Sequence, residues 1–298
     1  MNNTLLEAFL LIIVGMLARL TGLVKEQDNR ILSRFVFNIT LPFLVFLAMF
    51  RQQPTLIYLK ISLLTWLLLG IFTAILFFAG RVIIKDTRRL GVFILTAVGG
   101  NTAFLGYSVV HSLTGDAGMP IAVVYDQFGN GLFIYTVLLI LISNLTHKSL
   151  SWKNVLTGVL TPPFIALIIG LAFPVSVVLP KFVLNAIELV GNITTPLMML
   201  IVGMNLTKPV KLHSLPLLGT SALIKLMVMP LVMYLFISIT GLPAFPQKIT
   251  ILQSAMPSMM TSVVFAQLYD LDESLAAQIV FGTTFVSFFT LPFIWSVL

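Results

Sequence analysis

Two short polar stretches interrupt hydrophobic segments that are long enough to cross a bilayer, and both carry groups that hydrogen-bond small solutes. The first is Gly99-Gly100-Asn101-Thr102 and the second is Pro257-Ser258. Glycine and proline disrupt a helix, and backbone groups freed at membrane depth need partners other than lipid. Helices broken at matching positions of two halves are typical of a transporter's binding site, whereas close helix packing at the glycines is the structural alternative. The pattern predicts solute binding by Gly100, Asn101, Thr102, Pro257 and Ser258.

A second polar group lies in a later segment, where Asp126, Gln127 and Asn130 fall within one helical turn. A carboxylate inside a membrane helix is costly, so we predict a proton relay or coupling site at Asp126 and Gln127, with Asn130 contacting the solute. Alternatively, Asp126 lies near the outer membrane surface and is hydrated. Lys225 sits well inside another segment, where it either receives an anionic substrate or forms a structural ion pair, with Asp126 as the candidate partner.

Two copies of the pattern Asn-Ile-Thr-x-Pro lie inside hydrophobic segments. Proline within a helix removes a backbone hydrogen bond and kinks the helix, and nearby Thr or Asn side chains can bond the freed carbonyl groups. We favour structural kinks over direct ligand contacts, although a kink can also form the wall of a pocket. The residues concerned are Asn38, Pro42, Asn192 and Pro196.

The composition is that of an integral membrane protein. Of the 298 residues, 58% are hydrophobic and only 9% are charged, and the mean hydropathy is +1.07, whereas soluble domains carry about 25% charged residues. The chain has no cysteine, which excludes disulfides and thiolate metal sites. The net charge of +7 comes from basic residues between the hydrophobic segments, where such residues set membrane orientation, so no nucleic-acid partner is expected.

Ten hydrophobic segments of about 20 residues fit a chain of this length. Basic residues concentrate in alternate connections, among them Lys208 and Lys211, and cytoplasmic loops are the basic ones. This places both termini outside (periplasmic) and the 144–154 loop in the cytoplasm of a plasma (inner) membrane. The start of the chain has no basic leader or cleavage site, which predicts a retained helix rather than a signal peptide. The segments cover approximately residues 5–24, 34–50, 58–80, 90–110, 119–143, 155–178, 184–205, 215–240, 248–268 and 275–297.

The two halves of the chain match each other in register. The Asn-Ile-Thr-x-Pro patterns recur at an offset of 154 residues, and Ile94-Leu95 with Gly100-Asn101 matches Ile251-Leu252 with Pro257-Ser258 at an offset of 157. Each half has five segments, an odd number, so a repeat of the halves must be inverted in the membrane. We therefore expect an all-α membrane protein with a first repeat over residues 1–143 and a second over residues 155–298.

The sequence carries no motif of the common enzyme classes. It has no Walker A loop, no His-Glu-x-x-His zinc helix and no Gly-x-Ser-x-Gly elbow. His111, His147 and His213 fall in predicted loops, which suits solvated histidines. An intramembrane aspartyl protease needs two facing carboxylates, but Asp126 and Asp270 are predicted near opposite membrane surfaces. We expect no enzymatic activity, no cofactor and no metal.

With these residues in view, the chain resembles the auxin efflux carrier family over essentially its whole length, in particular bacterial members described as malate or malonate carriers. The resemblance is carried by residues 100–107 of the fourth segment, Pro257-Ser258 of the ninth, and Ala276-Ala277 and Thr290-Leu291-Pro292 of the tenth. It implies ten helices in two inverted five-helix repeats, similar to the sodium–bile acid symporters, with the broken helices 4 and 9 crossing. Helices 1, 2, 6 and 7 would form a scaffold that dimerises, and helices 3–5 and 8–10 a moving transport unit.

The chain departs from the plant members of this family at the first break. They have Asn-Pro-Asn where this chain has Gly99-Gly100-Asn101, so only Asn101 carries over as a substrate-contacting amide. Asn130 matches a polar contact on their fifth helix. Only residues 144–154 separate the fifth and sixth segments, so the long cytoplasmic loop of the plant carriers is missing, which argues against auxin as the substrate.

We therefore expect a secondary carrier that moves a small organic anion by alternating access, a mono- or dicarboxylate such as malate or malonate. Half-helix N-termini at the crossing would present positive dipole ends to a carboxylate. The expected partners are this solute, a coupling proton or sodium ion if there is one, the lipid bilayer, and a second copy of the chain. The alternatives are a carrier of a non-carboxylate solute and a non-transporting membrane sensor or assembly subunit built on a carrier fold.

Overall fold

The computed structural model describes residues 3–50, 52–148, 151–174, 176–206 and 214–298. Within these ranges the chain is helical and contains no strand, which confirms the predicted all-α class. The predictions made for Lys208, Lys211 and His213 lie outside the described residues.

The helices of the first half occupy the five hydrophobic segments predicted there. They are α1 Asn3–Leu20, α2 Glu26–Phe35, α3 Leu41–Met49, α4 Leu56–Ile83, α5 Thr87–Val98, α6 Ser108–Thr114, α7 Met119–Val124 and α8 Leu139–Thr146. Wider π-helical turns extend several of them, namely η1 Val36–Thr40, η2 Thr102–Tyr107, η4 Tyr125–Gly131 and η5 Ile134–Leu138. Such turns are rare and frequently mark functional sites, and here η2 and η4 contain predicted site residues.

The helices of the second half likewise follow the predicted segments. They are α9 Trp152–Val159, α10 Pro162–Ala172, α11 Lys181–Asn205, α12 Leu215–Leu223, η7 Ile224–Val228, α13 Met229–Ser238, α14 Ala244–Ser254, α15 Ser262–Leu268 and α16 Glu273–Val297. The sixth segment, predicted as one helix, is bent by 55° between α9 and α10. The bend arises because Thr161 precedes two prolines, and a residue before proline is driven out of the helical region; its ψ is 155°.

Among the residues that the structure describes, six helical stretches are long and apolar enough to cross a membrane, and the bent pair α9–α10 would make a seventh. The stretch Thr102–Thr146 is too long for one crossing, because its 45 residues would extend over about 68 Å in a hydrocarbon core of about 30 Å. Gly115 interrupts it with a φ of 60°, a conformation that glycine adopts without strain, and α7 packs back against η2. The chain therefore reverses between α6 and α7, and the protein is a multi-pass membrane protein.

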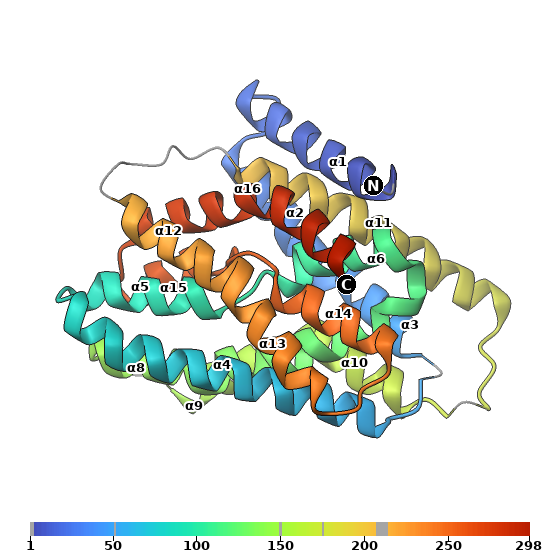
Figure 1. Ribbon diagram of the computed structural model, residues 1–298. Helices are drawn as coiled ribbons and strands as arrows, with labels where there is room; N and C mark the ends of the chain where they lie inside the picture. Colours follow the sequence, from blue (N-terminus) through green and yellow to red (C-terminus); the bar gives the residue numbers. More distant parts are fainter. Residues whose placement is uncertain (1–2, 51, 149–150, 175, 207–213) are drawn as a thin grey trace.

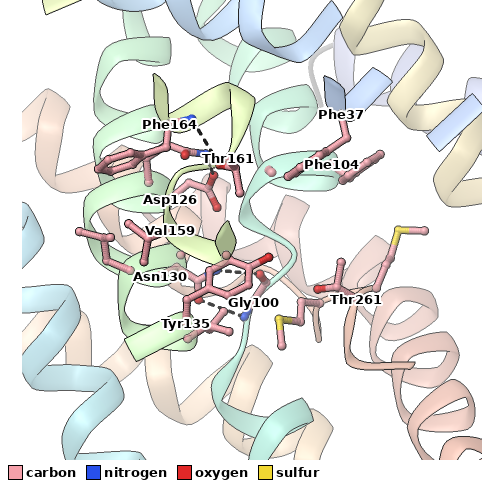
Figure 2. A pocket seen from close by; sticks show the side chains of 18 of the residues that line it. Phe37, Gly100, Phe104, Asp126, Asn130, Tyr135, Val159, Thr161, Phe164 and Thr261 are labelled. Atoms are coloured by element: carbon pink, nitrogen blue, oxygen red, sulfur yellow. Dashed lines mark hydrogen bonds between the residues drawn. The ribbon is translucent and has the colours of Figure 1, made fainter. Parts of the chain in front are cut away.

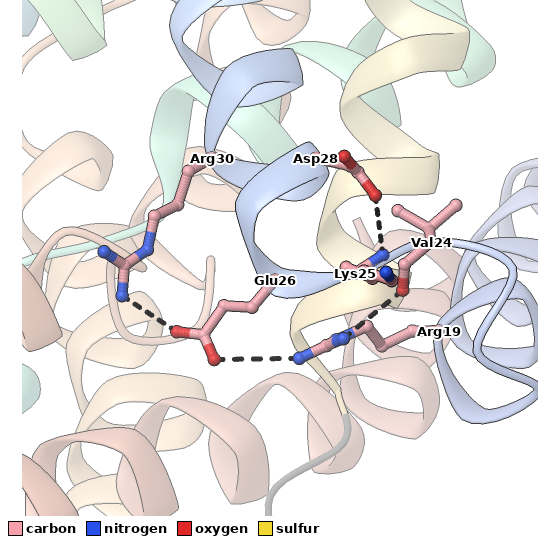
Figure 3. A network of polar contacts seen from close by, with 6 residues as sticks. All are labelled: Arg19, Val24, Lys25, Glu26, Asp28 and Arg30. Carbon is pink, nitrogen blue, oxygen red and sulfur yellow. Dashed lines mark hydrogen bonds and ion pairs between the residues drawn. The ribbon is translucent and has the colours of Figure 1, made fainter.

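The first connection is a helix where the hydropathy pattern predicts a loop. α2 runs on through η1 into α3, and its N-terminus is capped by Asp28, whose carboxylate accepts a 2.9 Å hydrogen bond from the backbone N–H of the residue before the helix. Glu26 lies between two arginines, with its carboxylate oxygens 2.9 Å from Arg30 and 3.7 Å from Arg19 (Figure 3). These charges made the segment too polar for a membrane span, but capping and ion pairing stabilise it as a helix.

Glycines bring α1 and α11 into backbone contact. A Cβ atom at Gly203 would lie 1.9 Å from the carbonyl oxygen of Ile12, and one at Gly15 would lie 2.1 Å from that of Leu200. Small residues at such crossings are the usual means of close helix packing in membranes. Figure 1 shows α1 lying along α11 at one edge of the molecule, with α4 at the opposite edge. α11 also packs on α3, and α3 packs on α10.

The buried centre of the protein is formed by the helices that lead to the two breaks. Every residue of α5 from Leu90 to Val98, every residue of α7 and every residue of α14 from Ile249 to Ser254 is buried. α5 comes from the first half of the chain and α14 from the second half, and both helices end in the buried middle of the molecule.

Candidate functional site

The two helix breaks meet at the centre of the molecule. The backbone N–H of Asn101 donates to the carbonyl oxygen of Pro257 at 2.7 Å, and the N–H of Met259 donates to that of Gly99 at 3.0 Å. The two extended segments thus form an isolated antiparallel bridge. Backbone groups at each break have no partner within their own helix, and the other break provides one. These bonds satisfy N–H and C=O groups that lipid cannot hydrogen-bond.

The side-chain amide of Asn130 holds the first break in place. Its Oδ1 accepts the backbone N–H of Gly100 at 3.3 Å, and its Nδ2 donates to the carbonyl oxygen of Gly100 at 3.1 Å. The same Nδ2 lies 2.9 Å from Oγ1 of Thr102. Asn130 therefore fixes the peptide unit at the break, and Figure 2 shows this pairing at the edge of a pocket.

The carboxylate of Asp126 accepts three hydrogen bonds from neutral groups. The hydroxyl of Thr102 donates to Oδ1, and Oδ2 lies 2.7 Å from both Oη of Tyr107 and Nε2 of Gln127. Asp126 is 6% exposed, and none of the ion pairs among the described residues includes it. The side chain is thus a buried carboxylate with hydrogen-bond partners but no counter-charge, rather than the hydrated surface group of the alternative interpretation.

Lys225 is a second buried ionisable group, and the predicted ion pair between it and Asp126 is not formed. Its Nζ lies 3.1 Å from the carbonyl oxygen of Ser254 and 3.8 Å from Sδ of Met229, and the residue is 1% exposed. Gly100 faces the same amine, since a Cβ atom there would lie 3.1 Å from Nζ. The two ionisable groups engage different partners: Asp126 bonds Thr102 beside the first break, and Lys225 bonds Ser254, which precedes the second break.

Ser258 and Asn101 are two further predicted solute contacts, and they differ in whether the protein provides hydrogen-bond partners for their side chains. The hydroxyl of Ser258 donates to the carbonyl oxygen of Thr96 at 2.7 Å, and its backbone N–H donates to Oγ1 of Thr283 at 3.2 Å. Nδ2 of Asn101, in contrast, is buried and has no hydrogen-bond partner among the described residues. Leaving such a donor unpaired costs about 1–3 kcal/mol. Asn101 is therefore the predicted contact whose side-chain donor remains available.

A pocket lies beside the first break (Figure 2). Its space, including the part open to solvent, is about 720 Å³. Four predicted residues line it, namely Gly100, Asp126, Gln127 and Asn130. The other predicted contacts are buried near the crossing but do not belong to the described pocket wall: Asn101, Thr102, Pro257, Ser258 and Lys225.

Aromatic side chains make up much of the pocket wall, and sequence reasoning missed them. They come from five separate elements, η1, η2, η5, α10 and α15, and are Phe37, Phe104, Tyr135, Phe164 and Phe265. The chain contains 24 phenylalanines, so no local signal distinguishes the few that meet at the pocket. Two further polar residues were missed although they flank the breaks. Tyr107 bonds Asp126, and Gln253 lies with Nε2 3.4 Å from the carbonyl oxygen of Thr102.

The two proline patterns lie away from the pocket. Pro42 is in the first turn of α3, directly after the π-helical turn η1, and Pro196 is inside α11. Asn38 donates from Nδ2 to the carbonyl oxygen of Arg34 at 2.8 Å and, like Asn192 and Pro196, it is exposed. None of the four pattern residues is part of the described pocket lining, so the structural interpretation as kinks remains the prediction for them.

The histidines differ in part from prediction. His111 lies in the last turn of α6 rather than in a loop, and its Nε2 is 3.3 Å from Oδ1 of Asp116. His147 follows the end of α8. In the part of the chain that the structure describes, no three His, Asp or Glu side chains gather as metal ligands do.

Comparisons with known proteins agree over the length of the chain. Residues 2–295 match the model of a family described as membrane transport protein. The chain is 25% identical over 293 residues to an uncharacterized transporter of Methanocaldococcus jannaschii, which covers 95% of this chain and 94% of the relative. It is 26% identical over 301 residues to an uncharacterized transporter of Methanothermobacter thermautotrophicus, covering 99% and 97% of the two chains.

Proposed function

This chain belongs to the auxin efflux carrier-type membrane transport family, and on that premise we propose that it is a secondary carrier of a small organic anion that works by alternating access. Membership makes it a transport protein rather than an enzyme. The observation that carries the proposal is the pocket, which lies against two joined helix breaks and is lined by the amides of Gln127 and Asn130. Broken helices at matching positions are where carriers hold their substrates.

The substrate class is proposed from the donors at the crossing. Carboxylate oxygens accept hydrogen bonds, and the unpaired Nδ2 of Asn101 can donate them. The helical segment 102–114 begins at the break, so its positive dipole end favours an anion there. We therefore propose a mono- or dicarboxylate such as malate or malonate as the solute.

The architecture we propose is ten membrane-spanning helices in two inverted repeats, residues 1–143 and 155–298. Its support is that the two breaks are built alike. In the first half Asn130, near the last helix of the repeat, accepts the backbone N–H of Gly100. In the second half Thr283, on the last helix α16, accepts the backbone N–H of Ser258. An odd number of spans in each half makes the repeats antiparallel in the membrane.

The moving parts are proposed from the packing of the helices. α1, α3, α10 and α11 pack on one another and would form the scaffold, while α4, α5, α7, α8 and α12–α16 would form the transport unit around the crossing. We propose that the scaffold dimerises, that the protein resides in a plasma (inner) membrane and that both termini are periplasmic. The excess of basic residues in alternate connections supports this orientation.

An organic cation is a second candidate solute, because Asp126 is the only carboxylate in the described pocket lining and no basic side chain accompanies it. The wall also contains the aromatic rings named above, and aromatic faces attract cations. A cation would pair directly with Asp126, whereas an anion would have to approach that carboxylate.

The test is exchange transport in proteoliposomes, in which labelled malate, malonate or an amine enters vesicles preloaded with the same unlabelled solute. We expect exchange of a carboxylate by the wild type and its loss in Asn101→Ala. Because Nδ2 of Asn101 has no described partner, that variant should insert and melt like the wild type. Asn154→Ala, at an exposed position of α9, is the matched control. Normal exchange by Asn101→Ala would overturn the site, and exchange of the amine alone would establish the second candidate.

A further inference from the structure

Two buried ionisable groups of opposite charge flank the first break without touching each other. Asp126 is held on one side through Thr102, and Lys225 lies on the other side against Gly100. Neither takes part in an ion pair within the described residues. Taken singly, each would be an uncompensated buried charge, which is among the costliest features that a protein can contain.

The hydrogen-bond partners around the two groups suit their charged forms. Both oxygens of Asp126 accept bonds, from two hydroxyls and one amide, as an ionised carboxylate does. Nζ of Lys225 donates to the carbonyl oxygen of Ser254, the last residue of α14. Helix C-termini favour cations there. With both groups ionised, the crossing carries one negative and one positive charge, and their sum is zero.

We propose that Asp126 and Lys225 are both ionised in the empty carrier and that this charge balance makes it a proton symporter. The solute enters as a monoanion, any second carboxyl group keeping its own proton, and Asp126 takes one further proton with it. This rests on the proposed function of the pocket. An added carboxylate would leave the crossing with a net negative charge in a medium of low dielectric constant, unless a proton from the same side neutralised it. Asp126 lines the pocket and can receive that proton, whereas Lys225 does not belong to the described lining. Transport is then electrically neutral, and the proton leaves with the solute.

No other acidic or basic side chain among the described residues is buried next to Asp126 or Lys225. The titratable side chains nearest Asp126 within the described ranges are tyrosines: Tyr107 by a hydrogen bond, Tyr125 as its neighbour in the chain and Tyr135 across the pocket. Of the helices that pack on its segment, α7 and α10 have no acidic or basic residue. Those of α4 and α14 are exposed Lys60 and Arg81 and half-buried Lys248. Around Lys225, α12 and α13 have no acidic or basic residue, and α5 carries Arg88 and Arg89 in its first turn. The acidic residue of α16 is Glu273, exposed at its first position.

The charge balance is tested first without any solute, by a thermal-melting cycle in detergent. Asp126→Asn and Lys225→Gln should each lower the melting temperature by several degrees, because each leaves one buried charge unbalanced. The double variant should melt close to the wild type, since it is again neutral. Lys153→Gln, at an exposed lysine of α9, should change nothing. Losses that simply add in the double variant would overturn the proposal.

The coupling is tested with malonate in proteoliposomes that contain a pH-sensitive dye, while current is recorded on a supported membrane. The wild type should acidify the lumen with no net current. Asp126→Asn should carry one proton fewer and give a net current, and Asp126→Asn/Lys225→Gln should also carry one proton fewer, because both variants lack the acceptor. A wild-type current, or an unchanged proton count in Asp126→Asn, would overturn the proposal. If no variant moves malonate, the proposed function fails for that solute, and the melting cycle still decides the charge balance.

Discussion

The α-carbon of Gly158 packs against the ring of Tyr135, so that a methyl group on Gly158 would lie 2.3 Å from Cδ1 of the ring. Both residues line the pocket. The contact joins α9 to η5, and the 55° bend begins shortly after it, where the chain turns into α10 and packs on α3. The pocket wall thus continues through a bent helix whose two arms touch different parts of the protein.

Substituting Gly158→Ala should slow transport more than it lowers stability. The added methyl group cannot fit unless the Tyr135 ring moves, and that ring borders the pocket. Exchange rates in proteoliposomes and melting temperatures in detergent measure the two effects. Tyr135→Ala removes the clash, so the double variant should recover part of the exchange that Gly158→Ala loses. A wild-type rate for Gly158→Ala would show that this wall does not limit solute passage.

Asn130→Ala should both destabilise the protein and slow transport. It leaves the buried N–H of Gly100 without its acceptor, at a cost of about 1–3 kcal/mol. Asn130→Asp keeps an acceptor but loses the donor to Gly100 and Thr102 and adds a charge beside Asp126, so it should be more damaging to anion transport. Thermal melting and solute exchange, measured on both variants, check whether Asn130→Asp impairs transport more than Asn130→Ala does. Equal effects would contradict the bidentate role of the amide.

Two glycine substitutions should change stability in opposite directions. At Gly203 a methyl group would collide with the carbonyl oxygen of Ile12, and such overpacking costs about 1–3 kcal/mol or more. At Gly219, inside α12, a methyl group would meet no described atom within 4 Å, and alanine there should stabilise the helix by about 0.5–1 kcal/mol. Melting temperatures of the two alanine variants in one detergent provide the measurement. A Gly203→Ala variant as stable as the wild type would mean that α1 and α11 can move apart freely.

The ion pair between Asp270 and Lys148 should make a small, pH-dependent contribution to stability. Nζ of Lys148 lies 2.5 Å from the Asp270 carboxylate, and this hydrogen bond and charge, with a smaller effect of Arg88, lower the pKa of Asp270 below its usual value. A carboxyl group with a lowered pKa in the folded state stabilises the protein above its unfolded-state pKa of about 3.9, and this stabilisation disappears as the pH falls through the folded pKa.

The variant Asp270→Asn isolates that charge. Asp270 has a φ of 52°, which asparagine tolerates, so the backbone should be unaffected. The wild type should melt slightly above the variant at neutral pH, and the difference should vanish as the pH falls below about 4. Asp116→Asn, at the exposed pair with His111, is the comparison. A difference that persists at low pH would contradict the electrostatic origin.

Much of the architecture follows from simple features of the sequence. Hydropathy located the helices, since lipid requires long apolar segments with satisfied backbones, and the glycines at 99–100 and Pro257 located both breaks. The Pro162-Pro163 pair predicts the bend at Thr161, but a hydropathy profile does not reveal it. α2 was missed because ion pairs and a cap, rather than apolar residues, stabilise it.

The site was less predictable than the helices. Asp126, Asn130 and Lys225 stood out because polar groups in lipid are costly, but their partners depend on packing. Lys225 bonds a carbonyl oxygen rather than Asp126, and that choice depends on where the end of α14 falls relative to η7. The aromatic wall of the pocket could not be inferred, because its residues come from five elements and resemble many others in the chain.

The bridge between the two breaks also bears on how the protein is made. The backbone N–H of Asn101 finds its acceptor on Pro257, which lies in the other half of the chain. While the ribosome is still producing the second half, the first break is already in the membrane with backbone groups that lipid cannot satisfy. The first half on its own should therefore be a target for quality-control proteases, and co-expression of the second half as a separate polypeptide should protect it.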